Sequence, residues 1–247
     1  MAEPAEPPGP APTDPLAALA AREGVPSAMA AARDTVDALL RDRGWRRTGA
    51  GDTVEALLRG AAASAVLEGS GSTLDDLRAG RTDADAAAAV RVSAELVGLL
   101  PTWRRSPVQA LARLHALAGD PADDTRGRPS SAAGAERLQR LGGLVLAPTA
   151  APAMVLAAVV HAELATAGAF GSRAGLVARA AERLVLTGTG VDPASTTVPE
   201  AGHARSPRAY AAALEGYHAG GPAGVTGWLV HAAEAYAYGV EVSPLRR

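Results

Sequence analysis

The stretch GAFGSRAGLVAR, residues 168–179, places glycines beside serine and arginine at what reads as a turn that opens a helix. Backbone N–H groups at a helix N-terminus bind anions such as phosphate. We therefore expect an anion- or nucleotide-binding site here, formed by Ser172, Arg173, Gly175 and Arg179. We also expect Ser172 to cap a helix that starts at Arg173. The alternative is an ordinary capped helix start, since every helix N-terminus has such donors.

The other residues suited to chemistry are histidines, at positions 115, 161, 203, 218 and 231. No two of them have the spacing typical of a metal site, and the chain has no cysteine. We therefore expect no metal ligand among them and predict surface or packed histidines. Two G-x-G segments, within 67–73 and 186–192, lack the third glycine of a dinucleotide site.

Helices must position these residues, because strand patterns are nearly absent from the sequence. Apolar residues recur at helical spacing over about 53–68, and these are Val54, Leu57, Leu58, Ala61 and Ala65. Further helices are expected over 84–100, 132–143, 151–166, 173–187, 206–218 and 222–239. We predict one all-α domain over residues 15–247, preceded by a disordered Pro-rich tail at residues 1–14.

The composition excludes several classes of protein. The net charge is −2, with acids and bases interspersed, so the basic stripe of a nucleic-acid binder is absent. The N-terminus has neither the basic nor the apolar region of a signal peptide. The most apolar run, residues 151–160, is too short to span a bilayer. We expect a cytoplasmic protein without membrane or nucleic-acid partners.

The segment AAVVHAELATAGAFGSRAGLVARAAERLVL, residues 157–186, resembles the Fic (Fido) domain family. That all-α family has a helix–loop–helix signature, H-P-F-x-[D/E]-G-N-G-R-x-x-R, and most characterised members transfer AMP from ATP to a protein hydroxyl group. Phe170, Gly175 and Arg179 match the signature's Phe, second Gly and last Arg. His161 precedes the signature's His position by seven residues, a common family feature. The resemblance implies a Fic-like helical bundle.

The reactive positions of the signature depart from the family. The positions of its catalytic His, metal-binding acid, Asn and first Arg are occupied by Gly168, Ser172, Ala174 and Leu176. AMP transfer needs a proton acceptor, a metal ion at the phosphates and donors for the developing charge. We therefore expect no catalytic residue here, no certain cofactor and no efficient AMP transfer.

A second resemblance lies upstream, where SAVLEG, from Ser64 to Gly69, matches the family's inhibitory motif, [S/T]-x-x-x-E-[G/N]. In autoinhibited members this Glu pairs with the last Arg of the signature and blocks the position of the ATP γ-phosphate. The resemblance implies a pair between Glu68 and Arg179, with Ser64 on the same helix face as Glu68. The pair is either a retained switch or a structural ion pair. We favour the structural role, because a switch without transfer chemistry controls nothing.

Together these features predict a Fic-like pseudoenzyme that acts as a binding or regulatory module for a protein partner, including a second copy of itself. One alternative is a divergent nucleotidyl transferase that still binds ATP or another phosphate ester. Its polar groups would be Glu163, Arg173, His161 and Arg128. Another alternative is a helical scaffold for protein interaction.

Overall fold

The computed structural model describes residues 14–43 and 48–246, which form α-helices joined by turns and loops and contain no β-strand. In chain order the helices are α1 (Pro15–Ala20), α2 (Val25–Arg43), α3 (Ala50–Leu67), α4 (Leu74–Arg78), α5 (Ala84–Arg105), α6 (Pro107–Ala118), α7 (Ala132–Leu146), α8 (Ala153–Thr166), α9 (Ala174–Gly188), α10 (Pro199–Ala204), α11 (Pro207–Ala219) and α12 (Gly221–Glu241). The expected all-α fold is confirmed. None of these helices combines the length and apolarity needed to cross a bilayer.

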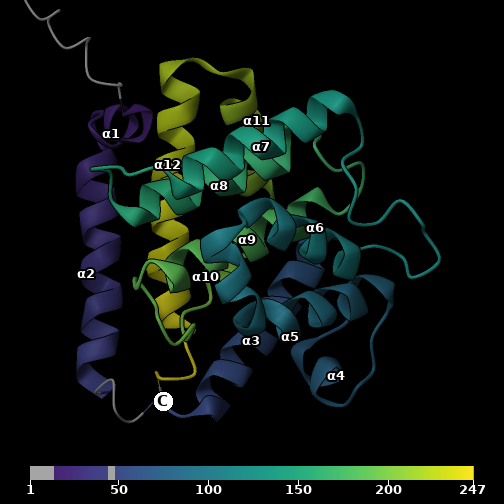
Figure 1. The fold of residues 1–247 in the computed structure, drawn as a ribbon. Helices are drawn as coiled ribbons and strands as arrows, with labels where there is room; N and C mark the ends of the chain where they lie inside the picture. The colour runs from purple at the N-terminus through teal and green to yellow at the C-terminus, as the bar shows by residue number, and fades with distance from the viewer. Residues whose placement is uncertain (1–13, 44–47, 247) are drawn as a thin grey trace, which may run out of the picture.

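Two helices, α8 and α9, pack along each other at the centre of the molecule (Figure 1). Helix α8 is apolar on all sides and is buried from 154 to 162, as expected of a helix enclosed by others. Helix α9 is buried from 176 to 187, although that segment contains Arg179, Glu182 and Arg183. These charged side chains therefore point into the protein interior and need partners there.

The remaining helices enclose this centre from two sides. Helix α2 packs along α12, whereas α3 packs against α5, and α10 contacts both α3 and α12. Figure 1 shows α2 and α3–α5 on opposite sides of the central helices. Side chains of α9, α10 and α12 meet in the interior, where Glu182 on α9 contacts His203 on α10 and Tyr236 on α12.

A glycine sets the close approach of α10 to α12. A Cβ added to Gly202 would lie 2.2 Å from the carbonyl oxygen of Ala235, so no other residue fits there. The next residue, His203, is fully buried as a result of this approach. The glycine thus positions a titratable side chain against α12.

The start of the folded region differs from the expectation in one residue. Residues 1–13 of the predicted tail lie outside the described residues, but Asp14 belongs to the fold. Its Oδ1 accepts hydrogen bonds from the Leu16 and Ala17 N–H groups, both at 3.1 Å, and thereby caps α1. Its Oδ2 accepts the Ala150 N–H at 2.8 Å, which attaches α1 to the loop before α8.

The helix expected over about 53–68 is α3, and it begins earlier than predicted. Asp52 Oδ2 accepts the Gly49 N–H at 3.0 Å, which stabilises a start at Ala50. At the other end Glu68 is the C-cap residue, one position beyond the helix. Its side chain nevertheless continues the face of α3 that contains Ser64.

Candidate functional site

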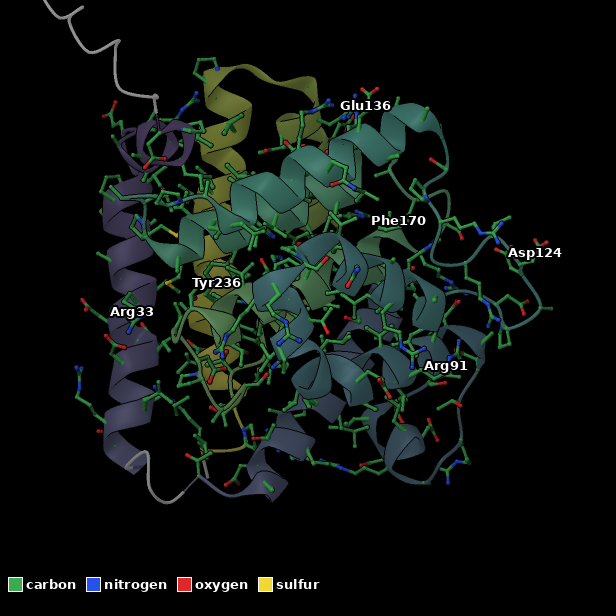
Figure 2. The ribbon with its side chains drawn as sticks, in the orientation of Figure 1. Arg33, Arg91, Asp124, Glu136, Phe170 and Tyr236 are labelled. Carbon is green, nitrogen blue, oxygen red and sulfur yellow. The ribbon has the colours of Figure 1, made fainter. Side chains whose placement is uncertain are left out.

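The loop between α8 and α9, residues 167–173, is held by a buried aromatic contact. Phe170 stacks on the His115 ring with 4.3 Å between the centroids, and Figure 2 shows Phe170 among the helices. The Gly127 N–H donates to His115 Nδ1 at 3.0 Å, so the ring proton is on Nε2, which bonds to the Ser172 backbone. Burial lowers the pKa of His115, which favours this neutral form.

The start of α9 differs from the sequence-based expectation. The helix begins at Ala174, and its N-cap residue is Arg173, whose backbone is left-handed with φ 59°. No side chain caps the first turn, so the predicted cap by Ser172 is wrong. The left-handed residue shifts the helix start, and Ser172 lies one position too early to be the cap. Leu176 is buried in the core, and Gly168 contributes no side chain.

Arg179 is 2% exposed and uses its guanidinium group entirely within the protein. Its Nη2 donates to Glu68 Oε1 at 2.7 Å, and its Nε donates to Ser64 Oγ at 3.0 Å. Its Nη1 donates to the Tyr210 hydroxyl at 3.2 Å. The structure thus brings Ser64 and Glu68 together with Arg179, which is more than a hundred residues from either of them in sequence.

The Glu68 carboxylate also faces the first turn of α9. Arg173 Nη1 lies 3.8 Å from Glu68 Oε2 and forms a closer ion pair with Asp85. A Cβ on Gly175 would lie 3.0 Å from Glu68 Oε1 and 3.1 Å from Arg179 Nη1. Both arginines of the expected anion site are therefore paired with acids of the same chain, and one of those acids, Glu68, lies against Gly175.

The groups expected to bind a phosphate ester in a divergent transferase do not converge. Arg173 is paired with Asp85, and Glu163 accepts the Tyr217 hydroxyl at 2.7 Å. His161 is fully buried, whereas Arg128 is exposed on the loop after α6.

Arginines instead line a surface pocket of about 360 Å³ beside α5 and α6, and they are Arg91, Arg113 and Arg126. Asp124 also lines it, and Figure 2 shows Arg91 and Asp124 on this side of the molecule. Arg91 donates to the carbonyl oxygens of Leu117 at 3.0 Å and of Gly119 at 3.2 Å. Those bonds hold the start of the loop. Arg113 Nη2 lies 3.6 Å from Glu95 Oε2, a long ion pair, so Arg113 and Arg126 are the cations of this pocket best placed to meet an anion.

The most concentrated polar chemistry lies deeper, in a group that we call the histidine cluster: His161 on α8, Glu182 on α9 and His203 on α10. All three side chains are 0% exposed, and one donor atom from each lies within 4.8 Å of the others. Glu182 Oε2 is 3.1 Å from His161 Nδ1 and 3.0 Å from His203 Nε2. Two imidazoles thus converge on one carboxylate oxygen.

Each member of the histidine cluster has a further partner on its outer side. His161 Nε2 lies 2.9 Å from the Tyr210 hydroxyl, and His203 Nδ1 lies 3.3 Å from His231 Nε2. Glu182 Oε1 accepts the Tyr236 hydroxyl at 2.9 Å. Figure 2 shows Tyr236 in the interior. These contacts fix the orientation of all three groups.

Aromatic rings enclose the cluster and exclude water. Trp228 stacks on His203 at an interplanar angle of 8° and meets His161 edge to face. Burial lowers the pKa of His203, and it lowers the pKa of His231 to about 4. Burial acts to raise the pKa of Glu182, but the neighbouring imidazoles hold that pKa well below its usual range. The cluster therefore contains a buried carboxylate.

No spacing of residues along the chain predicts this cluster, because its members come from three different helices. The expectation that each histidine is a surface or packed residue misses the juxtaposition of His161 and His203 with Glu182. One signal was present: His161 interrupts the apolar run of α8, whereas Glu182 lies beside Arg183 in a helix that also contains Arg179. A polar residue in a helix that is buried on all sides requires a polar partner.

No model of a protein family matches this chain, and no curated protein matches it.

Proposed function

We propose that this chain is a Fic-like helical protein that does not transfer AMP and serves as a binding or regulatory module for a protein partner. The observation that carries the proposal is the position of Glu68. Its carboxylate takes the place of an external anion at the start of α9, next to Arg173 and bonded to Arg179. A nucleotide phosphate would have to displace it.

Displacement of Glu68 would not restore chemistry to the loop. Gly168 stands at the position of the family's proton acceptor and has no side chain, and Leu176 is buried in the core. Ser172 replaces a carboxylate, which is the stronger ligand for Mg²⁺. With the acceptor and the metal ligand both missing, the largest contributions to phosphoryl-type transfer are absent.

The Glu68–Arg179 pair instead has a structural role in this proposal. Arg179 extends from the central helix α9 to the end of α3 and bonds to Ser64 in its last turn and to its C-cap residue, Glu68. The guanidinium group is buried, so its removal or the removal of its acid leaves an uncompensated charge. The pair therefore fixes α3 on the core rather than gating a reaction.

Labelled ATP tests this proposal directly. The wild-type chain and Glu68→Ala are incubated with ATP carrying a label on the α-phosphate, with Mg²⁺ or Mn²⁺, alone and with a bacterial lysate. We expect no labelled protein in either sample beyond that of a heat-inactivated control. Labelling that appears in Glu68→Ala would show that transfer chemistry survives and that the pair is an inhibitory switch.

The arginine-lined pocket favours a second candidate function, which is the binding of a phosphate ester without transfer. Thermal unfolding is measured with ATP, ADP and AMP, with and without Mg²⁺, since a ligand at 100 times its Kd stabilises the folded state by about 2.7 kcal/mol. A shift that is lost in Arg113→Ala supports this candidate. A shift that persists in Arg113→Ala and is lost in Arg173→Ala would instead locate a ligand at the start of α9.

The partner of the module is tested by measuring its mass in solution. Light scattering during gel filtration distinguishes the 24.8 kDa chain from a dimer of twice that mass. A dimer identifies a second copy as the partner, whereas a monomer directs the search to another protein.

A further inference from the structure

The histidine cluster has the donor set of a metal site. His161 Nδ1, Glu182 Oε2 and His203 Nε2 each offer one metal-ligand atom, and these atoms lie within 4.8 Å of one another. Two imidazole nitrogens and one carboxylate oxygen are ligands that bind Zn²⁺ and related divalent transition metal ions. The cluster lies outside the Glu68 site and takes no part in the proposed module function.

An unpartnered atom points to a missing cation. His161 Nδ1 is fully buried and has no hydrogen-bond partner, although Glu182 Oε2 is only 3.1 Å away. A ring N–H at Nδ1 would not point at that oxygen, so a proton on Nδ1 would form only a poor hydrogen bond to Glu182 despite the short distance. Buried polar atoms without a partner are rare in folded proteins, which makes this atom informative. A metal ion beside Nδ1 would satisfy it.

The outer contacts match those that support metal ligands. The second nitrogen of each metal-bound histidine usually bonds to another polar group, which fixes the ring orientation. Here His161 Nε2 contacts Tyr210 and His203 Nδ1 contacts His231. The second oxygen of Glu182 is also held, by the Tyr236 hydroxyl. Every ligand is thus oriented by a group that is not itself a ligand.

The charge balance of the interior also favours a cation. The adjacent Arg183 is committed to Glu200, with Nη2 at 2.5 Å from Oε2 and Nε at 2.8 Å from Oε1. Arg179 is committed to Glu68 and reaches the cluster only through Tyr210. Neither arginine forms an ion pair with Glu182, so this buried carboxylate has no arginine partner, an arrangement that proteins avoid in the absence of another cation.

We propose that His161, Glu182 and His203 form a buried binding site for one divalent transition metal ion of the zinc type. Three protein ligands leave a fourth tetrahedral position, which water takes in sites of this composition. The ligands are closed to solvent, so the ion enters while the chain folds and joins α8, α9 and α10 in the folded state. The rival explanation is a metal-free network of imidazole–carboxylate hydrogen bonds.

Metal content distinguishes the two. The full chain is produced without a polyhistidine tag, and its zinc, iron, cobalt, nickel and copper are measured by mass spectrometry. The same protein is then unfolded with a chelator and refolded with Zn²⁺, with Co²⁺ or without metal. We expect about one equivalent of metal per chain, a lower midpoint of thermal unfolding after metal-free refolding, and visible absorption bands of tetrahedral Co²⁺.

Variants locate the ion. Glu182→Gln, which nearly preserves side-chain volume, should lose the metal and the Co²⁺ bands. His231→Gln, which removes an outer contact, should weaken metal affinity by about 10–100-fold. His218→Gln is the matched control, because His218 is exposed on α11, and it should bind metal as the wild type does.

Two results would overturn the proposal, and the first needs no variant. The first is wild-type protein with less than a tenth of an equivalent of metal that refolds with the same unfolding midpoint with and without Zn²⁺ and gives no Co²⁺ bands. The second is full metal content in a folded Glu182→Gln protein, which would place the ion elsewhere.

Discussion

Among the described residues, Glu68 is the only acid within salt-bridge distance of the buried guanidinium group of Arg179, and replacing it with alanine removes that carboxylate. We expect the folded state to lose stability while the secondary structure is retained. The reason is that Arg179 is 2% exposed and cannot recover full hydration in place.

The structure sets the size of the effect. Removing one partner of a buried ion pair costs about 3–5 kcal/mol. Arg179 keeps two acceptors, Ser64 Oγ and the Tyr210 hydroxyl, and the Glu68 side chain is 16% exposed, so water can reach the vacated space. The loss should therefore be at the lower end, about 3 kcal/mol. Glu68→Gln retains an acceptor oxygen and should lose less, about 1–2 kcal/mol.

Urea unfolding followed by circular dichroism measures the loss. With an m-value of about 3 kcal/mol/M, a loss of 3 kcal/mol lowers the urea midpoint by about 1 M. The control is Glu136→Ala on α7, whose side chain is 74% exposed and lies 3.7 Å from Arg140, and its midpoint should stay near that of the wild type. Figure 2 shows Glu136 at the surface. A Glu68→Ala midpoint equal to that of Glu136→Ala would refute the structural role of the pair.

Three further predictions concern single sites. Gly175→Ala should cost about 1–2 kcal/mol in the wild type, because its Cβ would lie 3.0 Å from Glu68 Oε1, and the cost should be smaller in Glu68→Ala, where only the contact with Arg179 Nη1 at 3.1 Å remains. Equal costs in both backgrounds, measured by a urea double-mutant cycle, would contradict that contact. Burial lowers the pKa of folded His115 below its ordinary 6.5, so the unfolded chain binds the proton first and stability falls as the pH drops through 6.5. His115→Gln should reduce the change in unfolding free energy with pH by at most about 1.4 kcal/mol per pH unit, which corresponds to one proton. An unchanged pH dependence between pH 7 and 5 would assign the effect to other groups. Asp14→Ala should lower the urea midpoint through the lost cap of α1, whereas Asp14→Asn should retain most of the stability, and equal losses would show that the charge of Asp14 matters more than its cap.

Local patterns in the sequence predicted most of the helices, but not the short α10. Apolar residues at helical spacing indicated α3, and the all-α fold is confirmed by the described residues. Such patterns are reliable because hydrogen bonding in a helix connects residues four apart. The same local information failed at the start of α9, where a left-handed Arg173 moved the cap away from Ser172. Non-glycine residues rarely adopt that conformation, so propensity does not predict it.

The contact between Glu68 and Arg179 was predicted over a separation of 111 residues, but only through a resemblance between two motifs. Nothing in the periodicity of either helix indicates which acid a buried arginine will meet. The resemblance named the partners, and the packing of α3 beside α9 supplied the distance of 2.7 Å and the burial.

The histidine cluster was decided by tertiary structure alone. The sequence determined that His161 lies in an apolar helix and must therefore be buried with a polar partner. It did not determine that this partner is Glu182 or that His203 joins them, because Glu182 lies beside Arg183 on α9 and His203 belongs to a short helix that Gly202 holds close to α12. Helical periodicity operates within one segment, whereas a site built from three segments depends on the angles and distances at which the helices pack.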